Sequence, residues 1–181
     1  LWASGVTDPP LPFPANSAAH LDGSDDYVVI GDSSVLDFAA AESFTVEAWV
    51  RPWSTQSDLG ADTNSVIEKW SGSGGYPYAI RYGNQSGARS GLVWGARYDG
   101  SLYSEAVSTT AVDDGTFHHV AFVKDGSALL LYVDGVLEDT ETDTSAGTTA
   151  NASSFYIGQV GSGAGLLRGS VDDVRVWSVA R

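Results

Sequence analysis

The chain has 181 residues, of which 43% are hydrophobic, and it carries 9 basic against 23 acidic residues, a formal net charge of −14. So acidic a surface repels nucleic-acid phosphates and anionic lipids, and no apolar run approaches the roughly 18 residues of a membrane helix, so we expect neither nucleic-acid binding nor membrane insertion. The chain has no cysteine, so it has no disulfide and no zinc–thiolate site. It also has no methionine and begins at Leu1, so we expect it to be a processed product or part of a longer protein.

The first 17 residues are rich in proline. Because proline lacks an N–H donor and fixes φ, this stretch can form neither a helix nor a central strand. We predict an extended arm or linker over residues 1–17 and one folded domain over residues 18–181. Trp2 and Phe13 are available to anchor the arm on a neighbouring molecule, and packing of Phe13 on its own domain is the alternative.

From residue 19 onward the pattern is that of short strands. Runs rich in Val, Ile, Tyr, Phe and Trp alternate with clusters of Gly, Asp, Ser and Asn. Asp125-Gly126 and Asp134-Gly135 mark tight turns, because glycine tolerates positive φ. No segment keeps a period of 3.6, so we expect almost no helix beyond a short turn at 39–43. The predicted strands are 27–30, 44–53, 65–70, 78–82, 92–98, 102–107, 117–124, 128–134, 136–140, 154–158 and 167–177.

This series of strands predicts the fold class. About a dozen short strands without helices favour an all-β domain, a jelly-roll sandwich of two stacked antiparallel sheets. Every second residue of each strand then points inward. The residues that this alternation assigns to the central core are Phe44, Val46, Val50, Val120, Phe122, Leu129, Leu131, Ile157, Val174 and Val176.

Several segments, in order, resemble one family. They are AHLDGSDDYV at 19–28, SFTVEAWVRP at 43–52, FHHVAFVKDG at 117–126, LYVDGVL at 131–137, FYIG at 155–158 and GSVDDVRVW at 169–177. Together they are similar to the laminin-G-like, concanavalin-A-like lectin/glucanase domain, which implies a jelly roll over about residues 19–181. The resemblance is specific for the fold and not for function, because this fold carries lectins, adhesins, glycosidase accessory domains and filament subunits.

A hydrolase of this architecture needs paired carboxylates. The resemblance implies Glu-x-Asp-x-x-Glu on one strand, which places an acid and a nucleophile side by side. Glu47 is followed by Ala-Trp and Glu68 by Lys-Trp, so neither fits. His118 and His119 point to opposite faces of a strand, so they form no two-histidine metal site. We therefore expect no catalytic residue and no enzyme.

The acidic turn near the start of the domain is the candidate metal site. Asp22, Asp25 and Asp26 surround Gly23, and converging carboxylates suit a hard cation such as calcium. The resemblance adds Asp172, because domains of this kind hold a structural calcium near this loop and an aspartate of the closing segment. We therefore expect a structural calcium cofactor, and an ordinary solvated turn is the alternative.

Aromatic residues are the resource for sugar binding, because rings stack on the apolar faces of pyranoses. Rings on or beside the middle strands include Tyr78 and Tyr103, and packing in the core or at its edges is the alternative for each ring. Asn84 and Asn151 begin glycosylation triplets, which matter only if the source organism glycosylates. The predicted glycan-binding set is Trp53, Trp70, Tyr76, Trp94 and Tyr98.

Three functions remain open on the sequence. The first is an extracellular or cell-surface binding module, non-catalytic, with a glycan or an extracellular protein as partner. The second is a structural subunit of a filament, sheath or appendage, a homo-oligomer in which the N-terminal arm pairs with the sheet edge of the next copy. The third is a diverged glycosidase, against which the missing carboxylate spacing argues.

Overall fold

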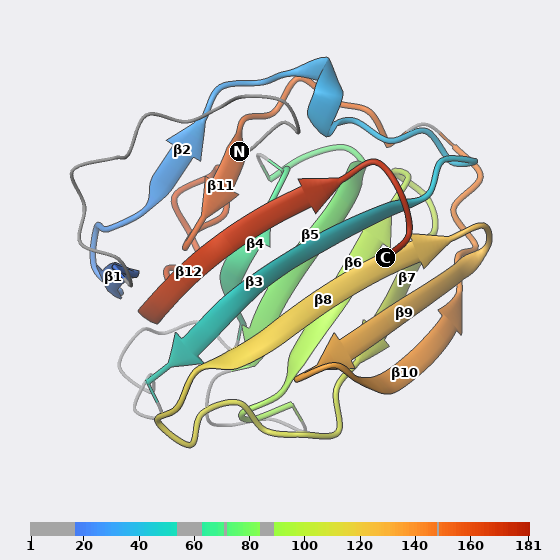
Figure 1. The fold of residues 1–181 in the computed structure, drawn as a ribbon. Helices are drawn as coiled ribbons and strands as arrows, with labels where there is room; N and C mark the ends of the chain where they lie inside the picture. Colours follow the sequence, from blue (N-terminus) through green and yellow to red (C-terminus); the bar gives the residue numbers. More distant parts are fainter. Residues whose placement is uncertain (1–16, 54–62, 71, 84–88, 148) are drawn as a thin grey trace, which may run out of the picture.

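The computed structural model describes residues 17–53, 63–70, 72–83, 89–147 and 149–181, so the predicted arm lies outside it except for Ser17. The described strands form two stacked six-stranded antiparallel sheets, with sheet A in front of sheet B in Figure 1. Sheet A has the order β1 (Ala19–Asp22), β12 (Arg168–Trp177), β3 (Phe44–Pro52), β8 (His118–Asp125), β9 (Ala128–Val133) and β10 (Val136–Thr142). Sheet B has the order β2 (Val28–Ile30), β11 (Phe155–Ile157), β4 (Thr63–Glu68), β5 (Tyr76–Gly83), β6 (Val93–Tyr98) and β7 (Tyr103–Val107).

The predicted all-β sandwich is confirmed. Among the described residues the helical structure is η1 (Ser34–Leu36), a single 3-10 turn, and no helix there is long and apolar enough to cross a membrane. The short turn expected at 39–43 is also present, since the Glu42 N–H donates to the Ala39 carbonyl at 3.0 Å. The two Asp-Gly turns join β8 to β9 and β9 to β10, and Asp134 and Gly135 both have positive φ, 51° and 77°, as a type I′ turn requires.

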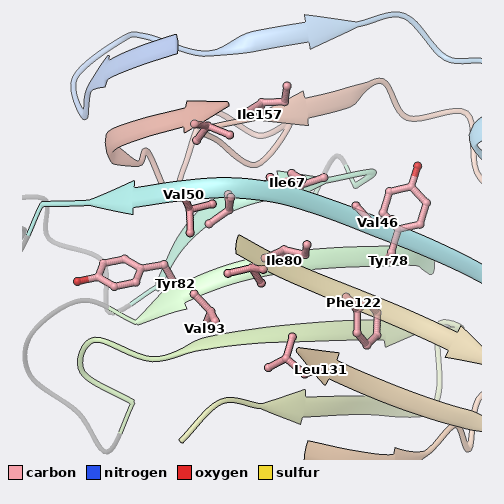
Figure 2. Packing of buried hydrophobic residues seen from close by; sticks show 14 of the residues in the cluster. Val46, Val50, Ile67, Tyr78, Ile80, Tyr82, Val93, Phe122, Leu131 and Ile157 are labelled. Carbon is pink, nitrogen blue, oxygen red and sulfur yellow. The ribbon is translucent and has the colours of Figure 1, made fainter. Parts of the chain in front are cut away.

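The core lies between the sheets (Figure 2). Val46, Phe122 and Leu131 of sheet A meet Tyr78 and Ile80 of sheet B there, all fully buried. Of the ten residues predicted for the core, eight are buried, and Val174 and Val176 are only partly buried against it. The register of β12 shifts between its pairs with Trp49 and Glu47, so simple alternation does not describe this strand.

One close contact ties the sheets together. Gly95 of β6 faces Phe122 of β8, and a Cβ atom built on Gly95 would lie 2.0 Å from the Cδ2 atom of that ring. Glycine is therefore required at this position by space, because any side chain would have to displace a fully buried ring.

We predict that Gly95→Ala destabilises the domain by about 1–3 kcal/mol, the usual cost of overpacking a core. Chemical denaturation would measure the loss, and Gly95→Ala combined with Phe122→Leu should recover part of it. Gly31→Ala is the matched control, since a Cβ atom at Gly31 meets nothing within 4 Å. Equal stability of Gly95→Ala and Gly31→Ala would contradict this packing.

A buried lysine holds the loops at one end of the sandwich. The Nζ atom of Lys69 lies 2.8 Å from Asp32 and 3.1 Å from Asp37, and it donates to the carbonyls of Asn151 and Ser153, both at 3.0 Å. The amide nitrogen of Asn151 donates to the carbonyls of Lys69 and Gly75, at 2.9 and 3.0 Å. A sugar on that nitrogen would replace one of its two hydrogens and so remove at least one of these bonds, which argues against glycosylation of Asn151 in this fold. Asn84 lies outside the described residues.

A histidine fixes the turn between β9 and β10. His118 Nδ1 lies 2.7 Å from the Asp134 carboxylate, and His118 Nε2 lies 3.1 Å from that of Asp114. Burial opposes protonation, but the hydrogen bonds and charges of Asp134 and Asp114 outweigh it and raise the pKa of His118. Protonated His118 therefore stabilises the folded state.

We predict a stability difference between the wild type and His118→Gln that depends on pH. A raised folded-state pKa adds stability that is fully present below the unfolded value, about 6.5, and is lost as pH rises through the folded value. Urea midpoints measured between about pH 5.5 and 8.5 should therefore converge as pH rises. Asp134→Asn should weaken this dependence, and a difference that stays constant with pH would argue against the proposed ion pair.

Candidate functional site

The outer face of sheet B carries a row of aromatic side chains. Tyr76 of β5 pairs with Tyr98 of β6, which pairs with Tyr103 of β7, so three tyrosines stand in one line across the strands. The ring centroids of Tyr76 and Tyr98 are 6.0 Å apart, and Trp70 extends the line at 5.4 Å from Tyr76. A register shift between Tyr76 and Ala79 brings Tyr76 onto this face.

Two further rows run beside the aromatic row. In the next row Glu68 and Glu105 stand at the ends, with Ala79 and Ala96 between them. The two alanines are fully buried and form a low floor between taller side chains. The third row brings Arg81 beside Trp94. We call these three rows, with Trp70 and Arg89, the aromatic face of sheet B.

Arginine 81 organises one end of the aromatic face. Its Nε atom donates to Glu68 at 2.6 Å and its Nη2 atom to the second oxygen of Glu68 at 3.2 Å. Its guanidinium also lies over the rings of Trp70 and Tyr76, 5.5 and 5.2 Å from their centroids. Burial raises the pKa of Tyr76 to about 12, so this tyrosine keeps its proton at neutral pH. Fixed rings and fixed donors make this end a preorganised surface.

The opposite end of the aromatic face is built around Glu105. The Tyr103 hydroxyl donates to Glu105 at 2.5 Å, and Arg89 Nη1 donates to it at 2.9 Å. Burial opposes ionisation of Glu105, but hydrogen bonds from Arg89 and Tyr103 outweigh it and lower its pKa. Arg89 also lies over the ring of Trp94, 4.8 Å from its centroid.

Four of the five aromatic residues predicted for glycan binding therefore gather on one face, and they differ in exposure. Trp70 and Tyr98 are half-buried and present their rings, whereas Tyr76 and Trp94 are buried and support them. Tyr103 was outside the predicted set, although it is 45% exposed and completes the row. Its place follows from pairing with Tyr98, which sequence alone does not reveal.

The fifth predicted residue, Trp53, lies elsewhere. The centroid of its ring is 4.9 Å from that of the His20 ring on β1. The guanidinium of Arg168, a residue of β12, lies 5.2 Å from the centroid of the Trp53 ring. Tyr78, also among the aromatic residues of the middle strands, is fully buried and donates its hydroxyl to the Leu36 carbonyl at 3.1 Å. Neither residue contributes to the aromatic face.

The acidic turn brings three of its four predicted ligands together. Oxygen atoms of Asp22, Asp25 and Asp26 all lie within 4.8 Å of one another, and all three residues are exposed. Asp22 accepts from the Ser24 N–H at 2.7 Å, and Asp26 accepts from the Asp22 N–H at 3.1 Å. An all-carboxylate donor set of this size suits a hard divalent cation.

The structure does not bring Asp172 to the acidic turn. Asp22 pairs with Arg168 across β1 and β12, and Asp172 lies four residues further along β12, opposite Trp49. At about 3.3 Å per residue the two aspartates are separated by roughly 13 Å along the strand. The resemblance placed Asp172 near the acidic turn, and β12 does pair with β1, but the register of that pairing keeps Asp172 away from the turn.

The two carboxylates of the aromatic face fix neighbouring arginine side chains and are not arranged as an acid–nucleophile pair. Glu68 and Glu105 are separated by three strand spacings, roughly 14 Å at the backbone. Each forms an ion pair with an arginine, and a general acid needs a raised pKa, whereas that of Glu105 is lowered.

Comparison with known proteins identifies the family. The model of the concanavalin A-like lectin/glucanases superfamily, Laminin_G_3, matches residues 22–181, so the chain belongs to this superfamily, as its resemblance suggested. A search of curated proteins by sequence found no match.

Solved structures share the fold at low sequence identity. The binding domain of Paraclostridial Mosquitocidal Protein 1 has a TM-score of 0.69 at 14% identity over 91% of this chain and 40% of its own. Domain 4 of AbnA, an extracellular GH43 arabinanase from Geobacillus stearothermophilus, was solved in complex with arabinotriose. It has a TM-score of 0.64 at 21% identity, over 90% of this chain and 71% of its own. Domains LG4-5 of the mouse laminin alpha1 chain have a TM-score of 0.63 at 13% identity, over 89% of this chain and 42% of their own. The chain thus spans less than half of two of these structures.

Proposed function

We propose that this chain is a non-catalytic, extracellular glycan-binding module that holds a saccharide on the aromatic face of sheet B. The observation that carries the proposal is the row of Trp70, Tyr76, Tyr98 and Tyr103, flanked by arginine–glutamate pairs. The fold is compatible with such a role, since the AbnA domain was solved with arabinotriose.

The chemistry of the aromatic face matches the two requirements of sugar recognition. The exposed ring of Tyr103 and the half-buried rings of Trp70 and Tyr98 offer flat apolar surface for the C–H face of a sugar ring. Arg89 and Glu105 are partly exposed, so their outer edges can exchange hydrogen bonds with hydroxyl groups. Because the ion pairs already fix these groups, binding needs little further ordering of side chains.

A glycan array followed by calorimetry with the best ligand tests this proposal, with arabinotriose as a first defined probe. We predict that Tyr103→Ala weakens binding about fivefold, because a stacking ring contributes on the order of 1 kcal/mol. Tyr27→Ala is the matched control, since Tyr27 is 48% exposed and lies beside β2, away from this face. Equal losses from the two variants would remove the aromatic face as the binding site.

Size measurement on the same sample addresses the assembly alternative. Polymers that grow with concentration and vanish when residues 1–16 are deleted would favour the filament subunit. A monomer with a specific array hit would favour the binding module. The arm needed for assembly lies outside the described residues, so the alternative keeps its basis in sequence alone.

We also propose that the acidic turn binds a structural calcium ion. Three exposed carboxylates within 4.8 Å repel one another, and a divalent cation would relieve that repulsion in a chain of net charge −14. The ion would brace the connection between β1 and β2, the edge strands of the two sheets.

Thermal melting with and without calcium tests the ion. A ligand that binds only the folded state raises the melting temperature, and we expect a rise of several degrees in excess calcium. Asp25→Asn should remove most of the rise. Asp172→Asn should keep it, because Asp172 lies away from the turn. Identical curves in calcium and in chelator would leave the segment a solvated turn.

A further inference from the structure

The outer face of sheet A, turned toward the viewer in Figure 1, holds a second site built by another transverse row. Arg175 of β12 pairs with Glu47 of β3, Glu47 with Ala121 of β8, and Ala121 with Tyr132 of β9. Ala121 is small and buried, so the row dips at its centre between taller side chains. Together with Trp177 these residues line an open groove of about 600 Å³.

The floor of the groove carries a fixed acceptor. The Glu47 side chain is 14% exposed, and its Oε1 atom accepts from the Trp177 Nε1–H at 3.0 Å. His119 Nε2 lies 3.5 Å from the second oxygen of Glu47, and Arg175 Nη1 lies 3.7 Å from the first. The carboxylate is thus held in place while an edge of it still faces the groove.

Two arginines lie beside this acceptor. Arg175 is 40% exposed, and its Nη2 atom pairs with Asp173 at 2.5 Å, while Nη1 stands beyond hydrogen-bond distance of Glu47. The exposed Arg181 guanidinium lies 3.9 Å from the centroid of the Trp177 ring. Two of the nine Lys and Arg residues of the chain, Arg175 and Arg181, line this groove. A guanidinium offers five hydrogen-bond donors, so Arg175 and Arg181 can still donate hydrogen bonds to the carboxylate of a ligand.

We propose that this groove is a second binding site, for a saccharide that carries a carboxylate, such as a uronate oligomer. Arg175 and Arg181 would receive the carboxylate, Glu47 would accept from hydroxyl groups, and Tyr132 and Trp177 would contact the apolar faces of the sugar rings. The row from Arg175 to Tyr132 spans three strand spacings, roughly 14 Å, so a short oligomer would lie across the strands.

The position of the groove favours a sugar over a peptide. An extended peptide binds a sheet by adding to an edge strand, where main-chain donors and acceptors are free. Of the strands that carry the groove, β3, β8 and β9 pair with neighbours on both sides in sheet A. Strand β12 pairs with β1 over residues 168–171 and, at the groove itself, with β3. Over β3, β8 and β9, which form most of the groove, recognition therefore depends on side chains.

The site is independent of the proposed function, because it lies on the opposite sheet. Its test is a titration of ¹⁵N-labelled protein with trigalacturonic acid, followed on the Trp177 indole signal, which Trp177→Phe assigns. We expect that signal to shift, the affinity to fall with added salt, and Arg175→Gln to weaken binding at least about tenfold. Arg51→Gln is the matched control on the same sheet, outside the groove, and Tyr103→Ala should bind normally.

Four outcomes would overturn the proposal. The neutral galactose trimer could shift the Trp177 signal as strongly as the acid, which would remove the role of the carboxylate. Arg175→Gln could bind like Arg51→Gln, or binding could be lost only in Tyr103→Ala, which would transfer the acidic sugar to the aromatic face. A triglutamate peptide that binds more tightly than the uronate would assign the groove to a protein partner.

Discussion

Both sheets of this sandwich must give one face to a single shared core, and that constraint determines where every other side chain can go. Alternate residues of β9, and of β3 from Val46 onward, are buried, and their neighbours form the outer face. In β8 the residues from Val120 to Lys124 are all buried. The fit is close enough that Gly95 can carry no side chain opposite Phe122. The side chains of the candidate binding sites are consequently confined to the two outer faces and the loops.

Local irregularities adjust this arrangement where the chemistry lies. The register shift in β5 brings Tyr76 and Ala79 to the same face, although simple alternation would separate them. The shift in β12 lets Val171 and Val174 both pack inward and leaves Arg175 paired with Glu47. Bulges of this kind re-aim side chains at the cost of one unpaired residue. Both candidate glycan sites contain a strand with such a shift.

Local signals in the sequence predicted much of the fold. Alternation in 44–52 and the Asp-Gly turns after β8 and β9 depend on neighbouring residues only, so strands, turns and most of the core could be read from them. The candidate sites depend on pairing between distant strands. Tyr103 joins the aromatic face through Tyr98, and Asp172 misses the acidic turn through the register of β12 with β1. No local pattern encodes such registers.

The ammonium group of Lys69 is a cation surrounded by oxygens of two loops. With oxygens of Asp32, Asp37, Asn151 and Ser153 around it at 2.8 to 3.1 Å, it takes the place that a bound metal would have between acidic loops. This cation is covalently part of the chain, so it cannot be chelated, diluted or exchanged. Loops 31–37 and 150–153 are therefore fastened to the end of β4 by a cation that belongs to the chain itself, and this junction needs no metal ion.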